Sequence, residues 1–217
     1  MSAFDPAFDE LPERIPIFPL SGVLLLPRGE LPLNIFEPRY LNMTADALAA
    51  DRMIGMIQPT DHESTQDAPP IYKTGCAGRI VSFQESDDGR FLIRLKGVCR
   101  FHAAEELPLC RGYRPVQPDW SAFRGDLASE PDGDIDREQL LSPLRGYFQQ
   151  QSIDADWKAI ESTPDERLVT SLAMICPFEP SEKQALLEAP TLAERGKVLN
   201  TLVAMSLHGG DCQAARQ

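Results

Sequence analysis

The sequence predicts an α+β protein in which a small β-barrel precedes a bundle of α-helices. Three observations lead to this expectation. Residues 1–118 hold short apolar or alternating runs separated by Pro and Gly, which is typical of a small barrel. Residues 119–135 are rich in Pro, Gly and acidic side chains, and we expect a linker there. From residue 136 to residue 210 the apolar positions follow helical spacing, which predicts the bundle.

The expected strands of the N-terminal half are short and closely spaced along the chain. They are predicted at residues 15–18, 23–26, 31–35, 53–57, 78–83 and 91–95. The last two flank the step Asp88-Gly89. Because this step supplies the positive φ angles that a tight turn needs, residues 78–101 are predicted to form a β-hairpin.

One helix is expected to interrupt the strands, immediately after the segment NIFEPRY at residues 34–40. Strand alternation stops near Phe36, and from Pro38 onward apolar residues recur at helical spacing. Proline fits the first helical position because its missing N–H would have no partner there. Glu37 and Arg39 would then lie at a strand-to-helix corner. An ion pair at this corner is favoured over the alternative of a general acid and its partner.

Four capping-box patterns predict where helices begin in the C-terminal half. They start at Asp136, Thr163, Ser181 and Thr191, and each has Glu or Gln three residues later. In such a box the first side chain accepts from an unpaired backbone N–H, and the last side chain reaches back to the first residue. Pro164 at the first helical position strengthens the second pattern.

The net charge and the N-terminal sequence limit the classes of partner and the compartment that we expect. The chain has 217 residues and a formal net charge of -12. This acidity opposes binding to nucleic acid, which needs a positive surface, and to anionic membranes. The N-terminus MSAFDPAFDELPERIP carries acids where a signal peptide needs a basic region, and no apolar run is long enough to span a bilayer. We therefore expect a cytoplasmic protein with no nucleic-acid or membrane partner.

Cysteine spacing points to the same compartment. The five cysteines are Cys76, Cys99, Cys110, Cys176 and Cys212, and none belongs to a CxxC pair. An odd number without paired spacing favours reduced cytoplasmic thiols over a disulfide framework.

Catalytic motifs are missing from the sequence. It contains no GxxxxGK[ST] phosphate loop, no GxGxxG, no GxSxG and no HExxH. We therefore expect no catalytic residue, no cofactor and no metal. Cys76, between Gly75 and Gly78, could be a nucleophile with His102 as its base, but glycines that allow a bend at a strand start are the favoured interpretation.

An acidic run resembles the opening of a calcium loop and then departs from it. Asp132, Asp134 and Asp136 have the right spacing, but Arg137 stands where the loop needs Gly and Pro143 where it needs a bidentate Glu. Acidic residues that lead into a helix N-terminus explain the same pattern, because carboxylates there favour the helix dipole.

Four segments of the chain resemble the N-terminal substrate-binding domain of Lon protease. They are IPIFPLSGVLLLPRGELPLNIFEPRYLNM, MIGMIQP, IYKTGCAGRIVSFQESDDGRFLIRLKGVCRF and DWKAIESTPDERLVTSLAMICPFEPSEKQALLEAP. The resemblance covers residues 12–207. It implies a PUA-like pseudo-β-barrel with one inserted helix, followed by a helical bundle. Full-length Lon continues into an ATPase module and a Ser-Lys peptidase module that this sequence lacks, so we expect a free-standing member of the family.

The resemblance makes a non-catalytic polypeptide-binding module the first functional expectation. Its partners would be unfolded or client polypeptides or a protease; the sequence leaves the oligomeric state open. An apolar groove or an open barrel edge would accept the extended chain. Aromatic candidates for the groove wall, which would equally suit a core, are Phe36, Tyr40, Phe83 and Phe91. The alternatives are an RNA-binding PUA-like module and a hydrolase that uses Cys76 or Glu37.

Overall fold

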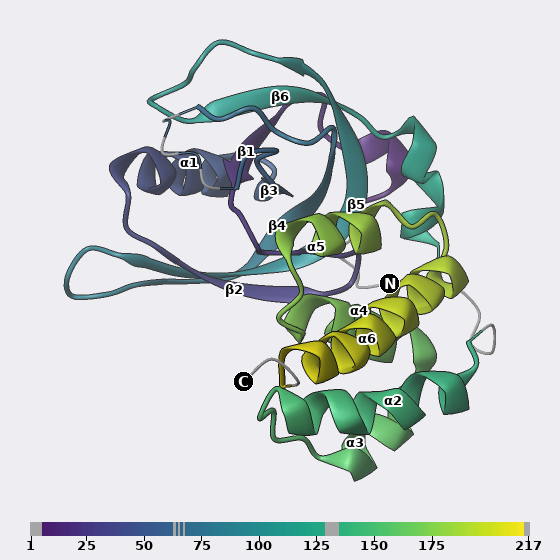
Figure 1. Cartoon of the computed structure of the whole chain (residues 1–217). Helices are drawn as coiled ribbons and strands as arrows, with labels where there is room; N and C mark the ends of the chain where they lie inside the picture. Colours follow the sequence, from purple (N-terminus) through teal and green to yellow (C-terminus); the bar gives the residue numbers. More distant parts are fainter. Residues whose placement is uncertain (1–5, 63, 65, 67, 129–134, 215–217) are drawn as a thin grey trace. The chain divides into compact units, whose positions relative to one another are not determined.

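The computed structural model describes residues 6–62, 64, 66, 68–128 and 135–214, with side chains up to residue 207. It has an α+β fold with two compact units (Figure 1). Residues 1–129 form the β unit, and residues 130–217 form the helical unit.

The sheet of the β unit closes on itself. Its strands are β1 (Ile15–Pro19), β2 (Glu30–Ile35), β3 (Met53–Ile57), β4 (Thr74–Glu85), β5 (Phe91–Glu106) and β6 (Arg114–Asp119). The strand order is β2-β5-β4-β3-β1-β6, and β5 also pairs with β6. This additional pairing joins β1, β3, β4, β5 and β6 into a ring and leaves β2 outside it. The pairing of β1 with β3 is parallel, and the other strand pairs are antiparallel.

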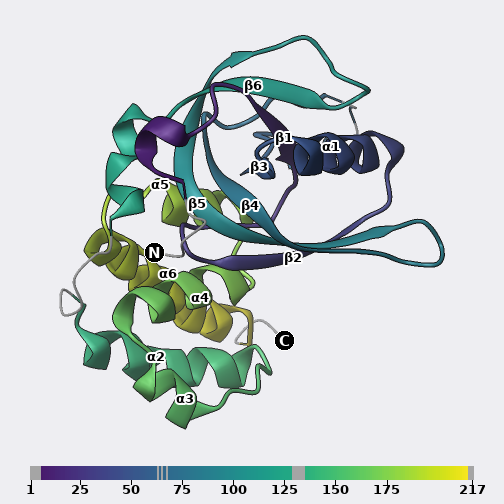
Figure 2. The same ribbon diagram turned by 180° about the vertical axis from the view of Figure 1, so that it is seen from behind.

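The β4–β5 hairpin runs beyond the ring. Since β3 pairs with β4 only through residues 76–79, residues 81–85 lie past the end of that contact. They pair with β5, whose other edge pairs with β2 over residues 91–96. We call residues 30–35, 81–85 and 91–96 the extension. In Figures 1 and 2 its β4–β5 hairpin projects past helix α1.

The hairpin predicted at residues 78–101 is confirmed by this pairing. Its turn is closed by a hydrogen bond from the Ser86 N–H to the Arg90 carbonyl oxygen at 2.9 Å. Gly89 has a φ of 79°, the left-handed conformation that the Asp-Gly step was expected to supply.

The strand predicted at residues 23–26 is wrong. This segment is irregular, although its three leucines are buried. It runs against β5, where the Arg28 N–H donates to the Gly97 carbonyl oxygen and the Gly97 N–H donates to the Gly29 carbonyl oxygen, both at 2.8 Å. A Cβ at Gly97 would lie 1.9 Å from the Leu26 carbonyl oxygen. The run is therefore apolar because it is buried against Gly97, and it does not pair as a strand.

Helix α1 (Pro38–Ala49) begins where the sequence predicts. Pro38 occupies the first turn, and the Glu37 carbonyl oxygen accepts from the Leu41 N–H at 2.9 Å. The helix buries one face through Tyr40, Met43, Thr44 and Ala47.

Much of the predicted linker folds into the β unit. Trp120 directly precedes the 3-10 segment η2 (Ser121–Leu127), and Phe123 lies within it. Both belong to the same buried apolar cluster as Phe101 and Val116. The linker predicted for 119–135 is therefore wrong up to residue 128. The prediction relied on the Pro, Gly and acidic residues of this segment, but its two aromatic side chains complete the core. Residues 129–134, with Asp132 and Asp134 of the calcium-like run, lie outside the described residues.

The helical unit is built around its last helix. Its helices are α2 (Arg137–Gln150), α3 (Trp157–Ser162), α4 (Asp165–Ile175), α5 (Pro180–Glu188) and α6 (Leu192–Ala214). Helix α6 contacts α2, α4 and α5, and its buried residues Leu199 and Val203 come from one of the apolar stripes in the sequence. Within the described part of the chain, no helix combines the length and apolar character needed to cross a bilayer.

Two of the four predicted helix starts are confirmed. The Asp136 carboxylate accepts from the Gln139 N–H at 3.0 Å, and the Thr191 hydroxyl accepts from the Glu194 N–H at 3.2 Å. The start predicted at Thr163 lies one residue too early. Helix α4 begins at Asp165 with Pro164 as its cap, whereas the Thr163 hydroxyl donates to the Ala159 carbonyl oxygen at 2.7 Å and closes α3.

The helix start predicted at Ser181 lies two residues too late. Helix α5 begins at Pro180, and the Glu179 N–H donates to the Glu182 carboxylate at 2.8 Å. Because proline fits the first helical position, the helix begins at Pro180, before the Ser181 pattern.

Thiol reactivity should follow burial. Cys99 and Cys176 are fully buried, and this burial raises their pKa to about 12; Cys110 is only half-buried. Because the thiolate is the reactive form, iodoacetamide at pH 8 should modify Cys110 well before Cys99 or Cys176 in the folded protein. Peptide mapping after timed quenching measures the order in which the cysteines are modified. In urea, where the protein is unfolded, the three cysteines should be modified at similar rates. Equal labelling rates in the folded state would contradict this expectation.

Candidate functional site

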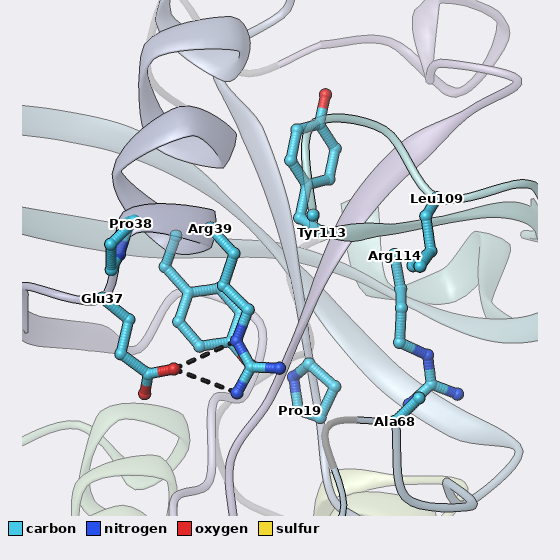
Figure 3. Close-up of a pocket in the computed structure, with 10 residues that line it drawn as sticks. Pro19, Glu37, Pro38, Arg39, Ala68, Leu109, Tyr113 and Arg114 are labelled. Atoms are coloured by element: carbon cyan, nitrogen blue, oxygen red, sulfur yellow. Dashed lines mark hydrogen bonds and ion pairs between the residues drawn. The ribbon is translucent and has the colours of Figure 1, made fainter.

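The EPRY segment forms the predicted corner ion pair. Arg39 donates from Nε and Nη2 to Oε2 of Glu37, at 3.0 and 2.9 Å (Figure 3). The Arg39 guanidinium also lies 4.8 Å from the centre of the Tyr40 ring, within the range of a cation–π contact. Both charged side chains are therefore held at the start of α1 by neighbouring residues of the same segment.

Tyr40 is largely a core residue. It is 7% exposed, and its ring lies 4.2 Å, centre to centre, from the ring of Phe18 in β1. The structure thus separates Tyr40 from the other three aromatic residues predicted to line a groove.

A tight turn between β5 and β6 faces this corner. Cys110 and Tyr113 exchange backbone hydrogen bonds of 2.9 Å, and the two residues between them have positive φ, 47° at Arg111 and 91° at Gly112. Two such residues make the turn geometry that matches strand twist. A Cβ at Gly112 would lie 3.2 Å from Cβ of Arg39, so the turn packs closely against the first turn of α1.

Polar contacts fasten the β5–β6 turn to α1. Arg111 forms an ion pair with Asp46 and donates to the Asn42 side-chain oxygen at 2.8 Å, and the Asn42 amide donates to the Arg111 carbonyl oxygen at 3.1 Å. The Tyr113 hydroxyl donates to Asp46 at 3.0 Å. Burial, together with side-chain hydrogen bonds to Cys110 and Asp46, raises the pKa of Tyr113, so its hydroxyl stays a neutral donor. The turn is therefore a fixed wall.

A cleft of about 460 Å³ lies between this turn and the start of α1. In Figure 3, Arg39 and Arg114 reach toward it from opposite sides, with Pro19 between them. We call it the arginine cleft. Its apolar surface comes from Pro19, Pro38, Tyr40, Leu109 and Tyr113.

Arg114 is held more tightly than Arg39. It donates from Nε and Nη2 to Oε2 of Glu106, at 2.9 and 2.6 Å, and from Nη1 to the Pro69 carbonyl oxygen at 2.7 Å. Its side chain is 9% exposed, whereas that of Glu106 is 47% exposed. The guanidinium is therefore fixed beside the cleft before any ligand arrives.

The other three predicted groove residues gather on the extension. Phe83 and Phe91 meet edge to face with ring centres 5.0 Å apart, and Ile35 of β2 pairs with Phe91. Phe36 therefore lies at the same end of the extension. Phe36 is 61% exposed and Phe83 is 43% exposed. The Phe36 ring lies 5.8 Å from the Arg90 guanidinium. We call Phe83 and Phe91, together with Phe36 at the adjoining end of β2, the aromatic patch. Large apolar side chains are seldom exposed together without a partner.

The aromatic patch lies beside an open strand edge. Ser86 and Arg90 form a hydrogen-bonded pair at the hairpin turn, and such pairs alternate with non-hydrogen-bonded pairs along antiparallel strands. Glu85 and Phe83 therefore belong to non-hydrogen-bonded pairs, and their N–H and C=O groups point away from β5. Since no described strand pairs with residues 81–85 on that side, these groups form an open edge.

The outer edge of β2 is less suited to strand addition. By the same alternation, Pro32 points its backbone away from β5, and it has no N–H to donate. A proline at an exposed edge discourages pairing with another strand.

Burial argues against the nucleophile considered at Cys76. Its side chain is fully buried in β4, and a Cβ at the neighbouring Gly75 would lie 2.7 Å from the Phe101 ring. His102 meets Thr74 at 3.3 Å and the Phe123 ring at 4.8 Å between centres. The glycines thus allow close packing, and the thiol is not accessible to a substrate.

The second wall of the arginine cleft is not predictable from the local sequence. Leu109 and Arg114 lie about seventy residues from the EPRY segment, and no local pattern links them to it. The Arg111-Gly112 step was the only nearby signal, and it indicates a tight turn without revealing what the turn faces.

Comparison with known proteins gives one consistent result. The family model of the ATP-dependent protease La (LON) substrate-binding domain matches residues 14–204. Lon protease of Desulfosudis oleivorans is 24% identical over 83% of this chain and 22% of that protease. Lon protease 2 of Thermus thermophilus is 25% identical over 91% of this chain and 25% of that protease. The chain therefore spans about a quarter of the length of these two relatives.

Solved structures share the fold. The crystal structure of a Lon N-terminal domain protein from Xanthomonas campestris is 23% identical, with a TM-score of 0.59 over 87% of this chain and 97% of that chain. The N-terminal domain of a Mycobacterium avium complex Lon protease is 15% identical, with a TM-score of 0.59 over 88% and 98% of the two chains.

Proposed function

Because the chain belongs to the ATP-dependent protease La (LON) substrate-binding domain family, we propose that it is a non-catalytic cytoplasmic module that binds unfolded or client polypeptides. The proposal includes a protease as the partner that receives them. At the level of fold, we propose that the β unit is the PUA-like pseudo-barrel of the family and the helical unit its bundle. The closed ring of strands and the helices packed on α6 support that assignment.

The observation that carries the proposal is the open edge of β4 beside the aromatic patch. An extended polypeptide can add to such an edge through backbone hydrogen bonds, while its alternate side chains meet the neighbouring surface. Phe83 and Glu85 offer the backbone groups, and the rings of Phe83 and Phe91 offer the apolar surface. Strand addition of this kind recognises backbone groups and apolar side chains without requiring a particular sequence, so it suits many unrelated unfolded segments.

The RNA-binding alternative is not favoured. The matching family is named for binding protease substrates, and the chain carries a formal net charge of -12. Nucleic-acid binding depends on clustered Lys and Arg that neutralise phosphates.

The experiment removes one N–H from the open edge and leaves the fold in place. Glu85→Pro deletes a donor that points away from β5, so the β4–β5 hydrogen bonds remain. We expect it to weaken binding of a labelled, reduced and alkylated polypeptide about tenfold, equivalent to about 1.4 kcal/mol, through a lost hydrogen bond and a steric block. Fluorescence anisotropy measures the affinity.

Glu85→Ala is the matched control, because it removes the same carboxylate but retains the N–H. It should bind much like the parent, and thermal melting should show both variants folded. Phe36→Ser should also weaken binding, since Phe36 is 61% exposed and its loss costs little core packing. Parental affinity in both Glu85→Pro and Phe36→Ser would refute the extension as the polypeptide site.

A further inference from the structure

The geometry points to a second binding site: the arginine cleft binds a carboxylate carried on an apolar group, supplied by the C-terminal residue of a polypeptide. This site lies on the EPRY segment and the β5–β6 turn, apart from the extension. It rests on the proposed function only in taking a polypeptide as the source of the carboxylate.

The guanidinium groups of the cleft favour an anionic ligand. The lining contains two arginines, Arg39 and Arg114, and one carboxylate, Glu37. Arg39 pairs with Glu37 and Arg114 pairs with Glu106. The cleft therefore has no excess of positive charge, and the anion is selected by the N–H donors of the Arg114 guanidinium. A ligand carboxylate can accept hydrogen bonds from these donors, whereas a basic ligand offers them no acceptor.

Hydrogen-bond donors are available for that anion. A guanidinium has five N–H groups and no acceptor. The contacts of Arg114 with Glu106 and the Pro69 carbonyl oxygen use three of these groups, and two remain for a ligand. Because these same contacts hold Arg114 in place, little side-chain freedom is lost when a carboxylate binds. Arg39 adds its charge from the other side.

The rest of the lining requires an apolar group next to the carboxylate. Two prolines and two tyrosine rings line the cleft, and Leu109 at its edge is 66% exposed. The volume of about 460 Å³ is within the usual range of about 300–1,000 Å³ for small-ligand sites. An inorganic anion would leave this apolar surface in contact with water.

A chain terminus meets both requirements at once. In a C-terminal residue the carboxylate and the side chain branch from the same Cα, so both enter one cleft. An internal Asp or Glu carries its carboxylate at the end of its own side chain, so any apolar group beside it must come from another residue. An apolar C-terminal residue is therefore the best match.

The test uses short peptides whose Gly-Ser spacer offers no apolar side chain to the aromatic patch. An N-terminally labelled Gly-Ser spacer ending in Ala-Leu is compared, by fluorescence anisotropy, as the free acid and as the C-terminal amide. A third peptide carries an internal Glu and an amidated end. We expect the free acid to bind, and the amide and the internal-Glu peptide to bind at least tenfold more weakly.

Variants place the binding in the cleft. Arg39→Gln should weaken the free acid at least fivefold, and Leu109→Ser should weaken it too. Arg145→Gln is the matched control: it removes an exposed arginine of the helical unit that pairs with Glu161 at 2.7 Å, and it should change nothing. Thermal melting confirms that each variant is folded.

Three outcomes overturn the proposal. Equal affinity of the acid and the amide would show that the carboxylate is not recognised. No binding of the acid at about 1 mM would show that the cleft is not a binding site. Tight binding of the internal-Glu peptide overturns the terminus as the source. Each leaves the proposed function intact, because that function is tested by Glu85→Pro with an unfolded polypeptide, which can be used with an amidated end.

Discussion

Replacing Asp126 by alanine is expected to destabilise the β unit by about 3–5 kcal/mol, because it removes the carboxylate that compensates the charge of a buried guanidinium. Asp126 accepts from Nη2 of Arg100 at 2.7 Å, from Nε at 2.9 Å and from the Arg100 backbone N–H at 2.9 Å. The two side chains are only 4% and 6% exposed. Burial opposes the charge on Arg100, but the hydrogen bonds and charge of Asp126 outweigh it and raise the pKa of Arg100.

The measurement is urea unfolding followed by Trp120 fluorescence in a Trp157→Phe background, which reports on the β unit. Glu30→Ala is the control, because its ion pair with Arg94 is half-exposed and such pairs contribute about 0–1 kcal/mol. The double variant Arg100→Met with Asp126→Leu should lose less stability than Asp126→Ala, since it buries no unpaired charge. If Asp126→Ala and Glu30→Ala unfold alike, the pair does not anchor η2 to β5.

Replacing Tyr40 by alanine is expected to destabilise the β unit by about 3–5 kcal/mol, the usual effect of deleting a buried aromatic ring. The ring is 7% exposed and packs on Phe18. Glu37→Gln should have a modest effect, about 0–1 kcal/mol, because its ion pair with Arg39 is partly exposed.

Thermal melting of both variants beside the parent gives the comparison. Tyr40→Phe is the control for the ring, because it keeps the packing and removes only the hydroxyl. If Tyr40→Ala and Glu37→Gln both melt with the parent, the role of the EPRY segment as a structural corner is wrong.

The predictions that succeeded from sequence rest on local chemistry. The Asp88-Gly89 step specified a hairpin because few residues adopt positive φ, and Pro38 marked a helix start because it lacks an N–H. The caps at Asp136 and Thr191 needed only three following residues. The predictions that failed had competing local signals. Thr163 could cap α4 or close α3, and the apolar run at 23–26 fits a strand or a buried irregular segment.

The sequence by itself determined the α+β class, the two periodicities and, through the combined segments, membership of the Lon substrate-binding family. Only the tertiary structure decided which side chains meet. It brought Arg114 and Leu109 opposite the EPRY corner, placed Trp120 in the core and left the edge of β4 open. Helix caps and turns are set by bonds within a few residues, whereas a cleft and a free edge depend on strand order and register. Those follow from how the whole chain buries its apolar surface, which no short segment encodes.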